Sequence, residues 1–304
     1  MKVIVPPIKS QGIKTKLVPW IMDVVKKTNS KGKWFEPFLG TGVVAFNSKS
    51  KEAILNDTNP HIINFYKGIQ KGEITPSIVK HYLENANENL SSSEDNGYVY
   101  YRAVRERFNK EFSPLDFLFL SRAGFNGMMR FGKKGNWNIP FCKKPNRFSQ
   151  AYVTKIVNQV AKVSSIITDK WEFHNKSFSE IIPLATSNDI IYCDPPYYGR
   201  YVDYYNGWSE EDEELLFKLL KNTKAKFILS TWHHNDWREN TMIEKYWSNF
   251  NIVTKDHFYH TGGNIENRKT VVEALVCNFE LNGINNHNHD LKEKEKTKQL
   301  VLHW

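Results

Sequence analysis

Apolar side chains follow two spacings along this chain, and each spacing predicts one kind of element. Apolar positions three to four residues apart predict helices over residues 17–27, 60–70, 76–90, 97–111, 149–168 and 209–221. Short apolar runs predict buried strands at residues 34–35, 53–55, 171–174, 189–193, 227–230 and 271–279. Because the predicted strands alternate with helices, we expect an α/β fold with a mainly parallel sheet.

Two segments depart from these patterns. Residues 121–147 are rich in Gly, Asn and Pro, which indicates turns or a hairpin rather than a long helix. Residues 281–304 form a polar tail that we expect to be loosely ordered.

Composition excludes several classes of protein. The 304 residues suffice for one large α/β domain or two smaller ones, and the 40% apolar and 14% aromatic content argues against disorder. The three cysteines, Cys142, Cys193 and Cys277, are too few and too far apart for a disulfide scaffold or a zinc finger. We find no signal peptide and no apolar run of membrane-spanning length, and therefore expect a soluble, cytoplasmic protein that binds no membrane.

The net charge of +9 is distributed unevenly. Residues 1–65 have a net charge of +6 and residues 66–162 of +8, whereas residues 163–280 have a net charge of −6. One interpretation is solvated surface of two signs, and the other is a segment that binds a polyanion beside a differently charged domain. Residues 121–147 contain seven basic side chains and no acid: Arg122, Arg130, Lys133, Lys134, Lys143, Lys144 and Arg147.

A glycine-rich turn follows the first predicted strand. The sequence Phe35–Ala45 contains G-x-G-x-x-A, and Asp57 ends the next predicted strand 17 residues after Gly40. Glycines of this spacing let the backbone approach a bulky cofactor, and an acid at that place accepts hydrogen bonds from ribose hydroxyls. The glycines alone are equally consistent with a simple turn. Together with Asp57 they favour a cofactor that contains a nucleoside.

A second motif, Asp194-Pro195-Pro196-Tyr197, follows the predicted strand 189–193. Ligands of open parallel sheets bind beyond the carboxyl ends of the strands. The prolines fix the backbone, so that the Asp194 carboxylate and the loop carbonyls offer only acceptors, which suits an aromatic amino group as substrate. Tyr197 offers a flat face on which a base stacks. The alternative is a rigid loop with a capping Asp194 and a core Tyr197.

With these motifs the chain resembles the Dam-type, alpha-ordered DNA adenine methyltransferases, which use S-adenosylmethionine. The resemblance covers most of residues 8–280. It rests on five ordered stretches: FEPFLGTGVVA at 35–45, NDTNPHIINFY at 56–66, FNGMMRFGKKGNWNIPF at 125–141, DPPY at 194–197 and RKTVVEALVCN at 268–278.

The resemblance implies a Rossmann-like S-adenosylmethionine-dependent methyltransferase sheet with a mainly helical, hairpin-containing DNA-recognition insert. Residues 1–65 and 163–280 would form the catalytic, cofactor-binding domain, and residues 66–162 the target-recognition insert. No metal is implied, because the sulfonium of the cofactor already makes its methyl group electrophilic.

The family's functional residues carry over to matching positions of this chain. The stretch Lys9-x-x-Gly12-x-Lys14 matches the family, with Ser10 and Ile13 as departures. The implied cofactor-binding residues are Lys14, Glu36, Phe38, Gly40, Gly42, Asp57, Phe178 and Asp194. The implied catalytic residues are Asp194, Pro195, Pro196 and Tyr197, and the implied DNA-binding residues are Lys9, Phe125, Asn126, Met128, Arg130, Lys133 and Lys134.

The predicted activity is methyl transfer to the exocyclic amino nitrogen of adenine, with base flipping, in a short sequence of double-stranded DNA. A companion restriction endonuclease is a further expected partner. Three alternatives stay open: an amino-cytosine methyltransferase, a dinucleotide-dependent oxidoreductase and a catalytically silent DNA-binding module.

Overall fold

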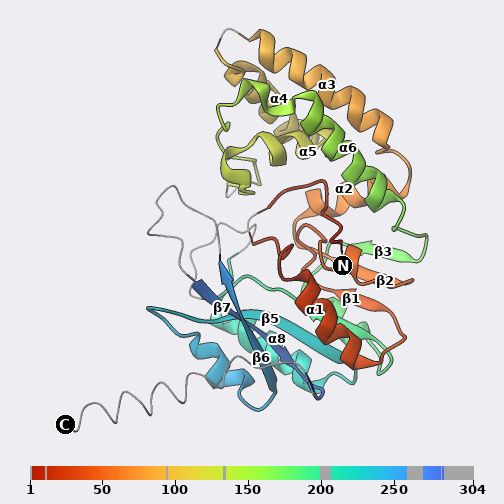
Figure 1. Cartoon of the computed structure of the whole chain (residues 1–304), viewed down its shortest axis with the longest axis vertical. Coiled ribbons are helices and arrows are strands. Elements are labelled where there is room, and N and C mark those ends of the chain that lie inside the picture. Colours follow the sequence, from red (N-terminus) through yellow and green to blue (C-terminus); the bar gives the residue numbers. More distant parts are fainter. Residues whose placement is uncertain are drawn as a thin grey trace, which may run out of the picture.

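The fold centres on one twisted sheet, seen in the computed structural model of residues 2–10, 12–93, 95–132, 135–198, 207–258, 270–281 and 283 (Figure 1). Its seven strands follow the order β3-β2-β1-β4-β5-β7-β6. The first five are parallel, and β7 runs antiparallel to both of its neighbours. The strands are β1 (Trp34–Glu36), β2 (Ala53–Asn56), β3 (Trp171–His174), β4 (Ile190–Cys193), β5 (Lys226–Asn235), β6 (Asn251–Phe258) and β7 (Thr270–Cys277).

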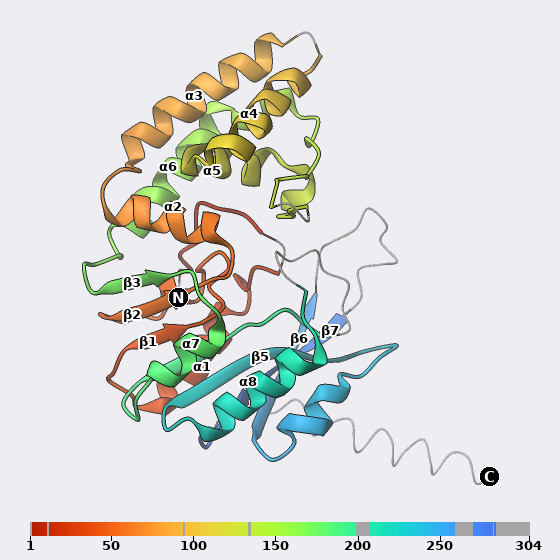
Figure 2. The same ribbon diagram turned by 180° about the vertical axis from the view of Figure 1, so that it is seen from behind.

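Helices cover both faces of this sheet. Helix α1 (Val18–Val25) lies on the face turned toward the reader in Figure 1, and α7 (Phe178–Ile181) and α8 (Glu210–Asn222) lie on the face seen in Figure 2. Alternate residues of β4 therefore enter two different cores: Ile190 and Tyr192 pack in the cluster that contains α1, and Ile191 packs with α8. Burial on both faces explains why this strand is a continuous apolar run.

The order of the strands creates a crevice at one edge of the sheet. From β1 the chain moves outward to β2 and β3, and then returns to β4 on the other side of β1. At such a reversal the loops that follow the two central strands diverge, which leaves room for a ligand. The doubly wound, Rossmann-like α/β class predicted from the sequence is confirmed.

Five further helices form a body beside the sheet, at the upper end of Figure 1. They are α2 (Pro60–Gln70), α3 (Pro76–Ser92), α4 (Tyr98–Glu111), α5 (Pro114–Ala123) and α6 (Gln150–Ser164). The division into a catalytic domain and an insert at 66–162 stays a prediction, and both of its boundaries fall inside helices, α2 and α6.

The elements missed by the sequence patterns include α5 and β6. Helix α5 is buried all round, so that its apolar residues show no helical stripe. Strand β6 is the last strand of the sheet, and among its described side chains only Val253 and Thr254 are buried, so that it contains no continuous apolar run.

The glycine-rich segment 121–147 forms a loose hairpin. Two isolated antiparallel bridges, Gly124 to Phe141 and Phe131 to Trp137, connect its arms. Arg122 does not belong to an exposed basic surface, because it is 5% exposed at the end of α5. Its guanidinium donates hydrogen bonds to the Pro7 carbonyl and to Gln159. Arg122, which was counted among the seven basic side chains of 121–147, instead anchors the N-terminal segment to the helical body.

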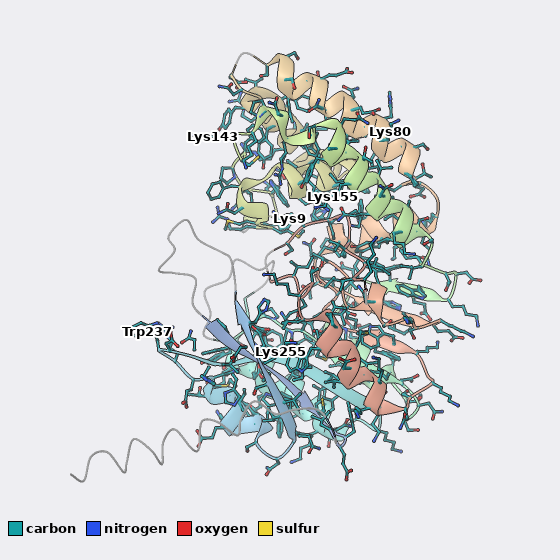
Figure 3. All side chains as sticks on the ribbon, viewed as in Figure 1. Lys9, Lys80, Lys143, Lys155, Trp237 and Lys255 are labelled. Carbon is teal, nitrogen blue, oxygen red and sulfur yellow. The ribbon has the colours of Figure 1, made fainter. Side chains whose placement is uncertain are left out.

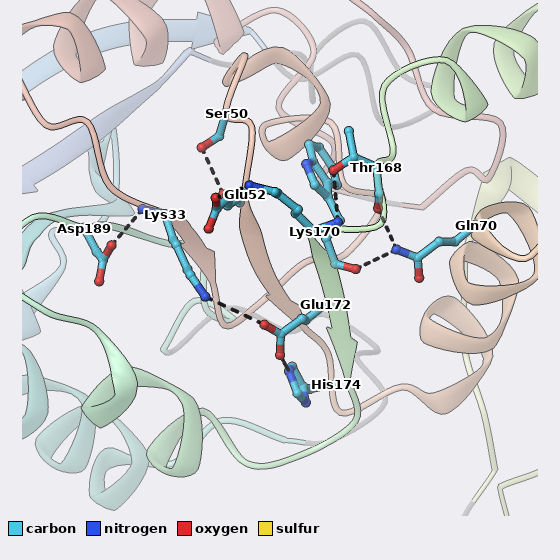
Figure 4. A network of polar contacts seen from close by, with 10 residues as sticks. Lys33, Ser50, Glu52, Gln70, Thr168, Lys170, Glu172, His174 and Asp189 are labelled. Atoms are coloured by element: carbon cyan, nitrogen blue, oxygen red, sulfur yellow. Dashed lines mark hydrogen bonds and ion pairs between the residues drawn. The ribbon is translucent and has the colours of Figure 1, made fainter.

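Strand β3 forms the edge of the sheet opposite β6. Its residues make polar contacts with neighbouring segments (Figure 4). Glu172 contacts Lys33 at 3.8 Å and His174 at 3.3 Å. Gln70 of α2 donates a hydrogen bond to the Trp171 carbonyl at 2.6 Å. Charged side chains along an edge strand discourage pairing with a strand of another molecule.

Among the described residues, no helix combines the length and apolar character needed to cross a membrane.

Candidate active site

A cavity of about 390 Å³ lies at the crevice between the carboxyl ends of β1, β2 and β4. It is lined by seven of the eight residues predicted to bind the cofactor: Lys14, Glu36, Phe38, Gly40, Asp57, Phe178 and Asp194. The eighth, Gly42, does not line it. Residues 180 positions apart in sequence thus meet in one site of the volume usual for small-molecule pockets.

The glycine-rich turn is held by Asp57. The Gly40 amide donates to one oxygen of the Asp57 carboxylate at 2.7 Å, and the Asn59 amide donates to the other at 2.8 Å. Burial raises the pKa of Asp57 to about 6, although both amide bonds act to lower it. Gly40 and Gly42 both have positive φ, and a Cβ on Gly42 would lie 2.5 Å from the Phe46 ring. Gly42 is therefore required by the turn and its packing.

A second carboxylate, Glu36, ends β1 beside the turn. It is 2% exposed and accepts a hydrogen bond from the Trp34 indole at 2.8 Å. Burial raises its pKa well above the usual value, and the nearby Asp194 and Asp57 carboxylates raise it further. Glu36 lines the same cavity as Asp57 and Asp194.

The third carboxylate, Asp194, follows β4 directly. Its Oδ1 lies 2.9 Å from Lys14 Nζ. Burial raises the pKa of Asp194, while Lys14 and a hydrogen bond from Ser230 lower it. Ser230 was not predicted from the sequence. It follows from strand register, because Cys193 pairs with Leu229, which places Ser230 beside Asp194.

Tyr197 lies beside this site rather than in the cavity wall. Its hydroxyl donates to Glu273 of β7 at 2.7 Å, and Lys14 Nζ lies 4.9 Å from the centre of its ring. Trp232 packs against the ring. Pro196 lines the cavity, whereas Pro195 does not. The stretch 268–278 contains Glu273, but the sequence predicted no role for it, because its contact with Tyr197 joins segments that are distant along the chain.

The residues predicted to bind DNA lie on the hairpin and beneath it. Phe125 is 47% exposed, and Asn126 next to it has a positive φ. Met128 packs against the main core, while Arg130 donates to the Asn138 side chain at 2.9 Å. The predicted contacts Lys133 and Lys134 lie outside the described residues.

Lys9 joins the hairpin to the N-terminal segment, and Figure 3 places it between the helical body and the sheet. Its aliphatic carbons lie within 3.0 Å of where a Cβ on Gly127 would stand. Burial lowers the pKa of Lys9, and Arg147 lowers it further.

One hairpin residue reaches the cofactor cavity. Met129 lines it, and its sulfur accepts a hydrogen bond from the Asn59 amide group at 3.4 Å. The hairpin therefore touches the segment that follows Asp57.

Among the described residues, no group of three or more His, Cys, Asp or Glu side chains is placed to hold a metal ion.

Fold and cavity together define a Rossmann-like protein with an acceptor-rich ligand site at its topological switch point. Residues 10–261 match the model of the D12 class N6 adenine-specific DNA methyltransferases, and the chain belongs to this family. The resemblance inferred from the five motifs is confirmed, and with it the class of enzyme.

Curated relatives agree with this assignment. The modification methylase StsI of Streptococcus sanguinis is 28% identical over 93% of this chain and 44% of its own length. The DNA adenine methylase of Haemophilus influenzae is 30% identical over 62% of this chain and 68% of its own, and that of Vibrio cholerae is 27% identical over 84% and 91%. The chain thus spans less than half of the StsI methylase and most of the two adenine methylases.

Proposed function

We propose that this chain transfers the methyl group of S-adenosylmethionine to the exocyclic amino nitrogen of adenine in a short sequence of double-stranded DNA. The observation that carries the proposal is the meeting of Asp194, at the end of β4, with the Gly40 turn and Asp57 in one cavity. Family membership supports the same reaction.

The residues present fit this cofactor. Asp57 offers carboxylate oxygens to ribose hydroxyls, and the glycine-rich turn allows close approach of the backbone. Asp57, Asp194 and Asp212 outnumber Lys14, the single Lys or Arg of the described cavity lining, which favours a ligand with a positive centre. When bound, S-adenosylmethionine supplies a methyl group that its sulfonium makes electrophilic.

Asp194 and its loop would prepare the nucleophile. An adenine amino group is a weak nucleophile because its lone pair is delocalised into the ring. The Asp194 carboxylate and the Pro195 carbonyl accept hydrogen bonds from the two N–H groups of the adenine amino nitrogen. These bonds localise its lone pair and direct it at the methyl group. Lys14 helps to keep Asp194 ionised, and an ionised carboxylate is an acceptor only.

DNA would be held by the helical body and its hairpin. The base must leave the duplex to reach Asp194, at a cost of a few kcal/mol, which contacts of the hairpin offset. Tyr197 stacks on the extruded base, and Arg130 reads a base edge. The name of the StsI relative, a modification methylase, supports pairing with a companion restriction endonuclease, and with it a cytoplasmic enzyme of bacteria or phages, as part of this proposal.

The test is transfer of labelled methyl groups to defined duplexes, followed by digestion and identification of the modified nucleoside. We expect N6-methyladenine from the wild type, no transfer by Asp194→Ala with cofactor binding retained, and full activity of the control Asp23→Ala, whose side chain is 62% exposed. N4-methylcytosine as the product would identify the amino-cytosine alternative. Absence of label in any DNA, single strands included, would refute the proposal.

A further inference from the structure

One end of the cavity is a wall of three aromatic rings. The ring centres of Phe38 and Phe178 lie 5.2 Å apart, and that of Trp208 lies 5.6 Å from the first and 5.5 Å from the second. All three residues line the cavity. Phe38 and Phe178 carry predicted cofactor contacts, whereas no motif draws attention to Trp208, which comes from the segment that leads into α8.

Trp208 is held by an acid of that helix. Glu213, 5% exposed in the first turn of α8, accepts the Trp208 indole N–H on Oε2 at 2.7 Å and the Trp247 indole N–H on Oε1 at 2.9 Å. Each oxygen of one buried carboxylate thus accepts a bond from a different tryptophan. Burial raises the pKa of Glu213, and both indole bonds lower it.

The two tryptophans differ in surroundings. Trp247 is fully buried in the core between α8 and the sheet, so its bond fixes Glu213 to the scaffold. Trp208 is half-buried, and part of its surface faces the cavity. The chain of contacts therefore runs from the rigid core through Glu213 to a ring that a ligand touches.

We propose that Trp208 is a cofactor-binding residue whose indole, with Phe38 and Phe178, forms the wall on which the adenine ring of the cofactor packs, and that Glu213 is the positioning residue of that indole. The inference rests on the proposed use of S-adenosylmethionine. It deepens that proposal by naming what selects the adenine end.

The cavity has a polar part and an aromatic part, and S-adenosylmethionine likewise has polar groups and one aromatic ring system. Asp57, Glu36, Asp194 and Lys14 offer charges and hydrogen bonds, which suit the ribose and the amino-acid part. The aromatic wall offers flat apolar surface, which suits the purine because it is the one flat, aromatic part of the molecule. Stacking of a base on an aromatic side chain contributes about 1–3 kcal/mol, or roughly 5- to 150-fold in affinity.

The experiment measures S-adenosylmethionine binding by calorimetry and by tryptophan fluorescence, without any turnover. We expect Trp208→Ala to weaken binding at least about fivefold. Trp208→Phe keeps a ring and should fold, but should lose the fluorescence change that the cofactor causes. The matched control Trp237→Phe, at a residue 73% exposed on the turn after β5, should retain both affinity and signal (Figure 3).

Variants of the acid separate positioning from stability. Glu213→Gln replaces one acceptor oxygen by an N–H donor. We expect this change to weaken cofactor binding when Trp208 is present. In the Trp208→Phe background, which has no indole N–H, we expect no further loss of cofactor affinity. Trp247→Phe removes the bond that fixes Glu213 to the core, so it should lower the melting temperature and also weaken cofactor binding. Additive losses in the double variant would overturn the positioning role of Glu213.

The outcomes also separate this inference from the proposed function. If the wild type binds S-adenosylmethionine and Trp208→Ala binds equally well, or Trp208→Phe retains the full fluorescence change, the inference is wrong and the proposed function stands. A wild type that binds no S-adenosylmethionine refutes the proposed function and the inference with it.

Discussion

The raised pKa of Asp57 predicts that cofactor affinity depends on pH. In the empty site the carboxylate titrates with a pKa of about 6, because burial disfavours its charged form. Above pH 6 it is ionised and accepts bonds on both oxygens. Below pH 6 it gains a proton, so that it loses its negative charge and part of its capacity to accept from ribose hydroxyls.

The size of the effect follows from the ionised fraction. With a pKa of about 6, roughly nine tenths of Asp57 is ionised at pH 7 and about one tenth at pH 5. If only the ionised form binds well, the dissociation constant rises about tenfold between pH 7 and pH 5. Calorimetric titration with S-adenosylmethionine at several pH values measures this directly.

Two variants make the test specific. Asp57→Asn has no ionisable group there, and we expect weaker binding at pH 7 together with a much flatter pH profile. Asp23→Asn, on the exposed surface of α1, should reproduce the wild-type profile. A wild-type affinity that is constant from pH 5 to pH 7, or an Asp57→Asn profile as steep as that of the wild type, refutes the reasoning.

Other predictions concern the catalytic loop, DNA binding and the glycine turn. Glu273→Gln weakens the bond that holds the Tyr197 hydroxyl, so the rate of methyl transfer in single-turnover assays should fall about tenfold with cofactor affinity unchanged; an unchanged rate contradicts this. Lys144→Glu should weaken DNA binding and reduce its salt slope by about one, whereas Lys80→Glu on the far side of α3 should not, as fluorescence anisotropy at several salt concentrations will show (Figure 3). Gly42→Ala should cost about 1–3 kcal/mol more than Gly72→Ala in urea unfolding, because both have similar positive φ but only the first meets a ring; equal losses would rule out the clash.

The parts of the site that the sequence predicts are those next to strand ends. Gly40, Asp57 and Asp194 each follow a short apolar run, and the carboxyl ends of parallel strands meet at one edge of the sheet. Local spacing is therefore enough to place these residues at one edge of the sheet. Their individual roles stay predictions.

The parts that the sequence does not predict are contacts between distant segments. Met129 and Trp208 reach the cavity from a hairpin and from a helix start, and Ser230 and Glu273 reach the catalytic loop from neighbouring strands. Met129 and Glu273 lie within the stretches 125–141 and 268–278, but no local spacing shows what they contact, because each position in space is set by strand order and register. Counting charge also misjudged Arg122, since a count does not distinguish a buried guanidinium from an exposed one.

The distribution of charge matches the two proposed ligands, which have opposite signs. The cavity in the sheet carries Asp57 and Asp194, and a sulfonium cofactor is attracted by such a site. DNA is a polyanion and is therefore attracted by positive charge. The basic excess of residues 66–162 lies in the helical body and its hairpin. An evenly basic protein would bind the phosphates but repel the cofactor. The overall charge of +9 therefore reflects a separation: cations on the helical body, and carboxylates at the switch point of the sheet, where Lys14 holds Asp194.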